Sequence, residues 1–284
     1  MELPGNAFIS QTLDMSRRGA PHAAYPSSVS PEVVMASWAD GWQRSWDRLE
    51  ESLAPDREWL IARLVDLVEA VAGPDAVVVD LGCGTGTVAL RLLRRLPSAS
   101  VIAVDVDPVL LSIASATFSE DGRVRIAAAD LRDDAWLATL PETSVDAVIT
   151  STALHWLPEH TVRRLYGDLA GLVRPGGLFA HAEVMPLADT PRVASAMTAL
   201  QRHRQAGRAD NGRSAWDQWW DAVAADPQLR DALAHRAEVF DTTYPAEEFS
   251  PAAAWHTAAL LGAGFVEADV VCRTMAGAIV AAVR

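Results

Sequence analysis

Three alternate glycines follow an aspartate at the end of a short hydrophobic run. The run covers residues 76–79, the aspartate is Asp80, and the glycines are Gly82, Gly84 and Gly86. Glycine allows the backbone to turn tightly and to approach a ligand closely. Residues 88–96 have the spacing of a helix, whose first N–H groups lack partners within the helix. This order of strand, glycines and helix predicts a small-molecule site at the carboxyl end of the strand.

The charge of Asp80 separates two nucleoside cofactors that suit such a loop. Residues 84–89 also fit the dinucleotide pattern G-x-G-x-x-A. A carboxylate at position 80 would repel the pyrophosphate of NAD, but it would attract the ammonium and sulfonium groups of S-adenosylmethionine (SAM). An NAD-dependent oxidoreductase is the less favoured alternative, because no tyrosine is followed by a lysine four residues later to form a proton-relay pair.

Two further aspartates follow later hydrophobic runs. Asp105 lies 19 residues after the last of the three glycines and is placed to accept hydrogen bonds from both ribose hydroxyls. Its alternative role, capping the next helix, suits Asp107 better because Asp107 directly precedes a proline. Asp130 is placed to accept from an adenine amino group, with the Leu131 N–H near a ring nitrogen; a turn residue is the alternative interpretation.

In order and spacing, these motifs resemble those of the class I SAM-dependent methyltransferases. The matching segments are residues 80–86, 104–105, 129–131, 145–149 and 174–177, so the resemblance covers roughly residues 75–183. Within it, residues 153–160 are similar to the corresponding stretch of the trans-aconitate methyltransferase-like group, which modifies small molecules. The motifs are specific to the class and do not identify a substrate.

The resemblance implies a role for each matching residue. Gly82, Gly84 and Gly86 would line the methionine part of SAM, and Asp80 would hold its ammonium. Asp105 would hold the ribose, with Val106 beside the adenine, while Asp130 and Leu131 would read the adenine edge. Thr150 and Ser151, which follow the fourth hydrophobic run, would lie near the amino-acid end of the cofactor.

Methyl transfer from a sulfonium is an in-line displacement that depends on placing the acceptor atom about 3 Å from the methyl group. A general base is needed only where the acceptor loses a proton. His155 is the candidate, because it lies five residues after Thr150 and because its ordinary pKa lies close to neutral pH. A purely structural His155 is the alternative interpretation, and His181 and Glu183 are further candidates at the end of the fifth run.

Aromatic residues outside the matching segments are candidates for an acceptor site. Trp38, Trp42 and Trp46 form a tryptophan stripe at helical spacing, which predicts either a lid over the site or packing in the core. Trp216 and Trp220 lie in a helical insertion, where they are candidates to contact the substrate. Tyr25, in the N-terminal arm, is a candidate to close over SAM.

The elements that would position these residues alternate between strand and helix. Hydrophobic runs typical of buried strands cover residues 76–79, 101–104, 124–128, 145–149 and 178–182, with helical spacing between them. A turn is expected at residues 175–177, and runs at 265–272 and 278–283 predict a terminal hairpin. The predicted fold class is α/β: a doubly wound, Rossmann-like, mostly parallel seven-stranded sheet with a C-terminal antiparallel hairpin and a helical cap.

We expect four regions along the chain. Residues 1–54 are an N-terminal arm and helical lid, and residues 55–185 are the SAM-binding Rossmann-like core. Residues 186–250 are a helical cap insertion, and residues 251–284 supply a helix and a β-hairpin that complete the core.

Composition narrows the class of partner and the compartment. The chain has 284 residues and a formal net charge of -13, so nucleic acid would be repelled on average. The sequence contains no apolar run of about 18 residues, so we expect no membrane span. The first residues do not resemble a secretory signal. The two cysteines favour a reducing, cytoplasmic compartment. Metal-ligand spacing is absent and residues 150–152 include no carboxylate, so we expect no metal.

The preferred hypothesis is a metal-independent methyltransferase that moves the methyl group of SAM to O, N or C of a small-molecule metabolite, in specialised metabolism. A SAM-fold protein repurposed for non-methylating chemistry is the alternative, because its cofactor motifs would look the same. A homodimer joined through the tryptophan-rich first helix is a further hypothesis.

Overall fold

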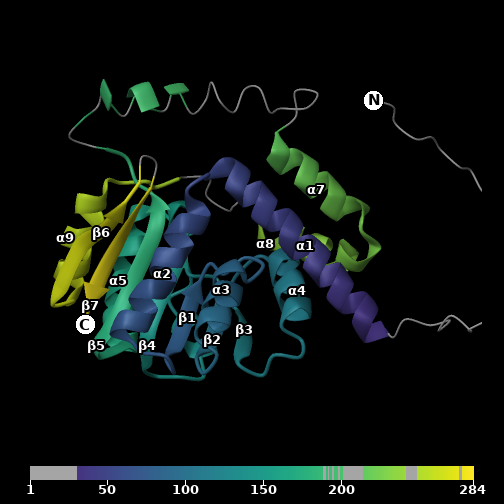
Figure 1. Cartoon of the computed structure of the whole chain (residues 1–284), viewed down its shortest axis with the longest axis horizontal. Helices are drawn as coiled ribbons and strands as arrows, with labels where there is room; N and C mark the ends of the chain where they lie inside the picture. The colour runs from purple at the N-terminus through teal and green to yellow at the C-terminus, as the bar shows by residue number, and fades with distance from the viewer. Residues whose placement is uncertain are drawn as a thin grey trace, which may run out of the picture.

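The centre of the molecule is one seven-stranded sheet with the strand order β3-β2-β1-β4-β5-β7-β6. The computed structural model describes residues 31–187, 214–240, 248–274 and 277–284, together with parts of 190–200. The strands are β1 (Val77–Leu81), β2 (Ser100–Asp105), β3 (Val124–Ala128), β4 (Val145–Ser151), β5 (Val173–Val184), β6 (Glu267–Arg273) and β7 (Gly277–Val283). Strands β1 to β5 pair in parallel, and β7 lies antiparallel between β5 and β6 (Figure 1). The predicted doubly wound sheet and its C-terminal hairpin are confirmed.

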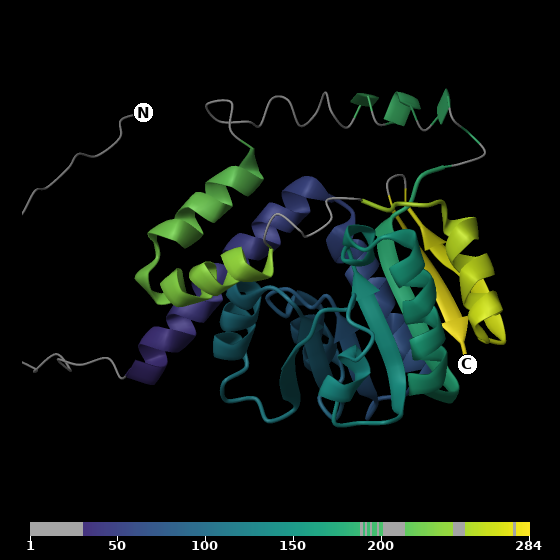
Figure 2. The same ribbon diagram turned by 180° about the vertical axis from the view of Figure 1, so that it is seen from behind.

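Helices cover both faces of this sheet (Figures 1 and 2). One face carries α2 (Arg57–Val71), α3 (Thr87–Arg95) and part of α4 (Pro108–Thr117), whose buried leucines and valines pack against the strands. The other face carries α5 (Glu159–Leu172) and α9 (Ala253–Ala263). Because both faces are covered, β1 is buried almost along its whole length, as expected for a parallel strand.

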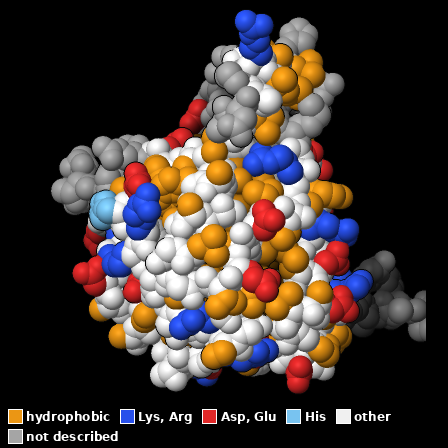
Figure 3. Space-filling view, turned by 90° about the vertical axis from the view of Figure 1, so that its left-hand side faces the viewer, with side chains coloured by type: hydrophobic (Ala, Val, Ile, Leu, Met, Phe, Trp, Pro, Cys, Tyr) orange, Lys and Arg blue, Asp and Glu red, His pale blue; other side chains and the backbone are white. Residues whose placement is uncertain are grey.

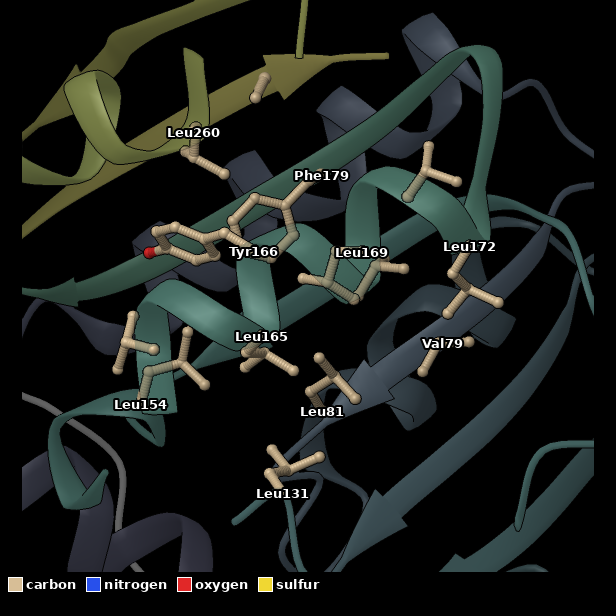
Figure 4. Packing of buried hydrophobic residues seen from close by; sticks show 14 of the residues in the cluster. Val79, Leu81, Leu131, Leu154, Leu165, Tyr166, Leu169, Leu172, Phe179 and Leu260 are labelled. Carbon is tan, nitrogen blue, oxygen red and sulfur yellow. The ribbon is translucent and has the colours of Figure 1, made fainter. Parts of the chain in front are cut away.

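The helix α5 shows how sequence periodicity produces this packing. Leu165 and Leu169, four residues apart, lie on the same side of α5 and are fully buried among the residues of β1 and β5 (Figure 4). Between them, the ring of Tyr166 packs edge-on against Phe179 of β5, with 5.4 Å between the ring centroids. Burial of each such side chain stabilises the fold by about 1.5–3 kcal/mol.

Strand β5 begins earlier than the sequence predicts. The expected turn at residues 175–177 lies inside the strand, because β4 pairs Val145 with Val173 and then Ala147 with Leu178. The intervening residues form an irregularity, in which the Gly176 N–H donates to the Arg284 carbonyl at 2.6 Å. The prediction of a turn before the strand was therefore wrong, because the proline and glycines form a bulge within the strand.

A second group of helices stands beside the sheet. The long α1 (Pro31–Leu53) runs past α4, with α7 (Ala215–Ala225) and α8 (Arg230–Val239) next to it (Figures 1 and 2). The tryptophan stripe of α1 packs against Trp219 of α7, with ring centroids 5.4 Å from Trp42 and 5.0 Å from Trp46. The stripe thus builds a cluster within the chain. The boundaries of the four expected regions stay predictions.

The face formed by α9 and β6 mixes hydrophobic and charged side chains (Figure 3). Leu261, Val266 and Val271 are about half exposed or more on it, with exposed fractions of 49%, 67% and 49%. Among the residues that the structure describes, no helix combines the length and the apolar character needed to cross a membrane.

Candidate active site

The glycine loop between β1 and α3 has a backbone that only glycine adopts readily. Gly82, Gly84 and Gly86 have φ angles of +66°, +57° and +88°. A Cβ built on Gly82 would overlap the side chain of Ala153, and one built on Gly86 would overlap the ring of Phe118. The loop is therefore held close to two neighbouring segments, at the carboxyl end of β1 where parallel sheets bind ligands.

Asp80 is a buried carboxylate that finds no hydrogen-bond partner within the described part of the chain. Its side chain belongs to β1 directly before the loop, the residue is 1% exposed, and neither Oδ1 nor Oδ2 makes a hydrogen bond to a described residue. Burial and then the negative charge of Asp105 raise the pKa of Asp80 to about 7, against the opposing positive charge of Arg57. A carboxylate in this state is suited to a cationic ligand group, which would supply the missing partner.

Asp105 ends β2 and holds the glycine loop in place. Its Oδ2 accepts a hydrogen bond from the Gly84 N–H at 2.8 Å, and its Oδ1 accepts from Val106 and Asp107 at 2.8 and 2.9 Å. Burial raises the pKa of Asp105, although these backbone N–H groups oppose the rise. Asp107 caps α4 by accepting from the Val109 N–H at 2.9 Å, which is the role that the sequence preferred for it. The ribose role of Asp105 stays a prediction.

Asp130 follows β3 and is occupied by an arginine. Its Oδ2 lies 2.6 Å from Nη2 of Arg132, and its Oδ1 accepts from the Arg132 backbone N–H at 2.9 Å. Burial would raise the pKa of Asp130, but Arg132 lowers it overall. These contacts are typical of a turn residue, which was the alternative interpretation of Asp130 in the sequence analysis. The adenine contacts of Asp130 and Leu131 stay predictions.

The ends of β4 and β5 bring His155 and Glu183 together. Thr150 and Ser151 are buried at the end of β4, and Thr152 then has a φ of +52°, which redirects the chain into the short helix η2 (Leu154–Trp156). His155 Nδ1 lies 2.9 Å from Oε2 of Glu183. The sequence named both residues as candidates for proton transfer without predicting this contact.

The two groups shift each other's ionisation. Burial would lower the pKa of His155, but the hydrogen bond and charge of Glu183 raise it overall. Burial would raise the pKa of Glu183, but the hydrogen bond with His155 and the proximity of His181 hold it at about 2. With Nδ1 donating to Glu183, neutral His155 presents Nε2 as a proton acceptor. The pair therefore has the arrangement of a general base and the carboxylate that orients it.

Further histidines extend this polar group into the core. His181 is 1% exposed, with Nε2 3.6 Å from Oε2 of Glu183 and no other partner among the described residues. Its ring meets that of His256 edge-on at 4.8 Å, and His256 Nδ1 lies 2.7 Å from the Tyr166 hydroxyl. Burial lowers the pKa of His256 to about 3, so this histidine is neutral.

Two residues of the site have no signal in the sequence. Glu50, near the end of α1, and Arg57, at the start of α2, form an ion pair with 3.3 Å between Oε2 and Nε. The Thr152 hydroxyl donates to the same Glu50 oxygen at 3.4 Å. Burial raises the pKa of Glu50, against the opposing charge of Arg57. Their proximity depends on how α1 meets α2, which no local pattern describes.

Helix α1 also covers the glycine loop. The indole of Trp46 lies against Gly84, with Nε1 3.6 Å from the Cβ position of that glycine. The Gln43 amide donates to the Thr87 hydroxyl at 2.9 Å, and this hydroxyl donates to Asp47 at 2.8 Å. These bonds fasten α1 to the first residue of α3.

The candidate substrate residues lie in the contact between α1 and the helices α7 and α8. The indole N–H groups of Trp38 and Trp42 both donate to Asp226 Oδ2 at 2.8 Å. Trp216 is tilted against Trp46 at 6.0 Å, and Trp220 lies under the guanidinium of Arg236 at 3.9 Å. Packing, one of the two roles considered for the stripe, is thus observed for Trp38. Tyr25 lies outside the described residues, and substrate contacts of these residues stay predictions.

Arg236 joins α8 to the cofactor side of the sheet. Its Nε lies 2.6 Å from Oδ2 of Asp107, the residue that caps α4.

In the part of the chain that the structure describes, no group of three or more His, Cys, Asp or Glu side chains is arranged to hold a metal ion.

Comparison with known proteins shows that this chain is similar to methyltransferases. Residues 78–177 match the family model of a methyltransferase domain. The chain is 34% identical over 140 residues to an uncharacterized methyltransferase of Mycobacterium tuberculosis, covering 49% of this chain and 64% of the relative. It is 35% identical over 137 residues to trans-aconitate 2-methyltransferase of an Azoarcus species, covering 48% and 49%. The chain thus spans between about half and two thirds of the length of these relatives.

Solved structures share the fold at low sequence identity. A putative O-methyltransferase from Nostoc punctiforme has a TM-score of 0.52 and 16% identity, over 93% of this chain and 64% of that one. A chain from the complex of the Haloferax volcanii Trm112 methyltransferase activator with a putative methyltransferase also gives 0.52, with 18% identity, over 90% and 99%. Both likenesses concern the fold alone.

Proposed function

We propose that this chain, whose residues 78–177 match the family model of a methyltransferase domain, uses SAM to methylate O, N or C of a small-molecule metabolite without a metal ion. The observation that carries the proposal is the orphaned carboxylate of Asp80 beside three left-handed glycines. SAM has an ammonium group and a sulfonium, and both favour a nearby buried carboxylate. The residues present therefore fit this cofactor.

The cofactor would extend along the carboxyl ends of β1, β2 and β4. Gly82, Gly84 and Gly86 would line its methionine part, and Asp80 would hold the ammonium, next to Thr150 and Ser151. Asp105 retains one lone-pair site, on Oδ2, for a ribose hydroxyl beyond those that its three backbone donors use. Val106 would flank the adenine, and Asp130 with Leu131 would meet its edge.

SAM supplies a methyl group already activated by its sulfonium, so the chain's own residues position the acceptor and remove its proton. His155 Nε2 accepts the acceptor's proton, while Nδ1–H stays hydrogen-bonded to Glu183 at 2.9 Å. Glu183 stays ionised and stabilises the imidazolium that forms. The Thr152 turn and the hydrogen bond from the Phe249 N–H to the His155 carbonyl hold η2 in position.

The acceptor class follows from charge and from the surrounding helices. A net charge of -13 disfavours nucleic acid, and a base of the kind formed by His155 suits an acceptor with a hydroxyl, an amine or an acidic C–H. Trp38, Trp216, Trp220 and Tyr25 are proposed contacts for it. One relative is named for trans-aconitate, a small carboxylate, which supports the small-molecule class. Cytoplasmic location and a homodimer are further parts of this proposal.

The test is calorimetric titration of the purified chain with S-adenosylhomocysteine, the product of methyl donation, with NAD as the control ligand. Binding of the product alone supports the proposal, and a screen of acceptors with labelled SAM then identifies the substrate. Binding of the product without methyl transfer to any acceptor would favour the repurposed SAM-fold alternative. No binding by folded protein, or binding of NAD alone, would overturn the cofactor assignment.

A further inference from the structure

Glu183 is a buried carboxylate that faces two histidines. The residue is 3% exposed near the end of β5, and its Oε1 accepts a hydrogen bond from the Val184 N–H at 2.9 Å. Its Oε2 lies 2.9 Å from Nδ1 of His155 and 3.6 Å from Nε2 of His181. One oxygen is thus held by the backbone, and the other is shared between the candidate base and a histidine of the core.

His181 makes no hydrogen bond within the described part of the chain. The residue is 1% exposed, and both Nδ1 and Nε2 are buried without such a partner. An imidazole has at least one N–H in each of its usual ionisation states, and a buried N–H without an acceptor is unfavourable. Among the described residues, Glu183 is the one carboxylate within ion-pair distance of His181. A shift of about 0.5 Å turns this contact into a hydrogen bond, so Glu183 is the acceptor within reach.

The ring of His181 is packed so that it stays near Glu183. The strands on either side pair His181 with Thr150 of β4 and with Val280 of β7. The ring of His256 meets it edge-on at 4.8 Å, and His256 Nδ1 lies 2.7 Å from the hydroxyl of Tyr166. Burial raises the pKa of Tyr166 and lowers that of His256 to about 3, so the hydroxyl keeps its proton and donates to a neutral imidazole. Tyr166 therefore holds His256 in place against His181.

We propose that His181 is a positioning residue for the His155–Glu183 pair. Its Nε2–H donates to Oε2 of Glu183 and holds that oxygen where it accepts from Nδ1–H of His155. His155 Nε2 is then left free to receive the acceptor's proton. A base must itself reach the acceptor, and His181 is too deeply buried to do so, with an exposed fraction of 1%. The inference rests on the proposed function and deepens it by adding a residue of the core to the candidate base.

The first test uses the wild-type chain and needs no acceptor. The protein is labelled with ¹⁵N-histidine, and the ring nitrogens of its seven histidines are followed by NMR through neutral pH. The signals are assigned with His155→Gln and His181→Gln. Neutral His155 should carry its proton on Nδ1, and His181 should carry one on Nε2. A wild-type His181 with its proton on Nδ1 alone would overturn the proposal.

The second test replaces His181. His181→Phe keeps a ring against His256 and removes the donor, whereas His181→Gln keeps an N–H near the position of Nε2. In His181→Phe the proton of neutral His155 should be divided between Nδ1 and Nε2. The pKa of His155 should also fall, because Glu183 raises it in wild type and would no longer be held in line. His181→Gln should restore both properties.

The other groups around His155 stay the same in these variants. The charges of Glu248 and Glu50 also raise the pKa of His155, so the fall should be no larger than in Glu183→Gln. His160→Phe is the matched control, because His160 is exposed on α5, and it should leave the His155 signals unchanged.

Two results in a folded His181→Phe would contradict the proposal. Unchanged tautomer and pKa of His155 would mean that His181 only fills space in the core. A higher pKa of His155 would mean that His181 competes with His155 for Glu183 instead of positioning it. If circular dichroism shows that His181→Phe does not fold, the wild-type tautomer and the smaller variant His181→Leu decide in its place.

Ligand binding and kinetics separate this inference from the proposed function. His181→Phe should bind S-adenosylhomocysteine as wild type does, and failure of wild type to bind it would overturn the proposed function while the NMR measurements still test the positioning. With an identified acceptor, His181→Phe should lower kcat by about 10- to 100-fold without changing KM. Added to Glu183→Gln, it should lower kcat no further, because both act on the same contact, and full additivity would overturn the proposal.

Discussion

Replacing Asp80 by asparagine should stabilise the chain and weaken its cofactor binding. The residue is 1% exposed, and neither oxygen has a hydrogen-bond partner among the described residues, so ionised Asp80 is unfavourable in the folded protein. Its pKa is about 7 in the folded state against an ordinary value of 3.8. The folded chain therefore binds this proton more tightly than the unfolded chain does, and stability falls as the pH rises from about 4 to about 7.

The size of the effect follows from that pKa. Ionised Asp80 destabilises the folded chain by about 4 kcal/mol at neutral pH, and by about half as much near pH 5.5. Asparagine keeps the shape and removes the charge, but its buried amide has a constant cost of about 1–3 kcal/mol. The gain of Asp80→Asn over wild type should thus be about 2 kcal/mol larger near pH 8 than near pH 5.5.

Urea unfolding at both pH values, followed by tryptophan fluorescence and circular dichroism, measures this difference. Asp75→Asn, in the exposed turn before β1, is the control variant, because it removes a carboxylate that solvent reaches. Titration with S-adenosylhomocysteine should show affinity reduced by about 10- to 100-fold in Asp80→Asn. If Asp80→Asn changed stability equally at the two pH values, or bound S-adenosylhomocysteine as wild type does, Asp80 would not be a destabilising carboxylate that binds a cationic ligand group.

Four other variants test the base and its carboxylate partner, the glycine loop, and the contact between α1 and Asp226. His155→Gln should lower kcat by about 10²- to 10⁴-fold with unchanged binding of S-adenosylhomocysteine. Since only neutral His155 accepts a proton and Glu183 raises its pKa, the wild-type rate should rise with pH to a midpoint above 6.5. In Glu183→Gln that midpoint should fall, and a profile identical to wild type would contradict the pairing. Gly86→Ala should lose about 2–4 kcal/mol in urea unfolding, because its φ is +88° and its Cβ collides with an aromatic ring. Gly122→Ala, where a Cβ meets open space, is the control and should change little. Asp226→Ala removes the acceptor of two indole N–H groups, so it should lose about 1–3 kcal/mol and alter the near-ultraviolet circular dichroism; an unchanged spectrum would count against these two hydrogen bonds.

Sequence reasoning located the parts of the site that are local in the chain. Asp80 and the three glycines are contiguous, and their spacing alone requires a turn at the end of a strand. The strands themselves were predictable because parallel strands buried on both faces are continuous hydrophobic runs. The exception is β5, whose Pro-Gly-Gly segment indicates a turn in isolation but is held in the sheet by pairing on both sides of it.

The contacts between distant segments were not predictable in this way. His155 and Glu183 meet because the parallel register of β4 and β5 pairs Ser151, the last residue of β4, with Ala182, so Glu183 lies where the chain leaves β4. The Arg57–Glu50 pair depends on the angle at which α1 joins α2, and arginine in a helix is exposed far more often than it is buried. Register and helix docking are set by the whole fold and leave no motif.

The position of β7 between β5 and β6 has a consequence for how the chain folds. β5 ends at residue 184 and β7 begins at residue 277, so the edge of β5 stays unpaired while the intervening residues are synthesised. Its last residues are almost all apolar or buried, which makes this edge a template for pairing with another nascent chain. The late, non-local closure of the sheet should also be slow, because the loop entropy is lost before the strand contacts form. We therefore expect yield of native protein to depend on temperature and chaperones during synthesis more than on the stability of the finished fold.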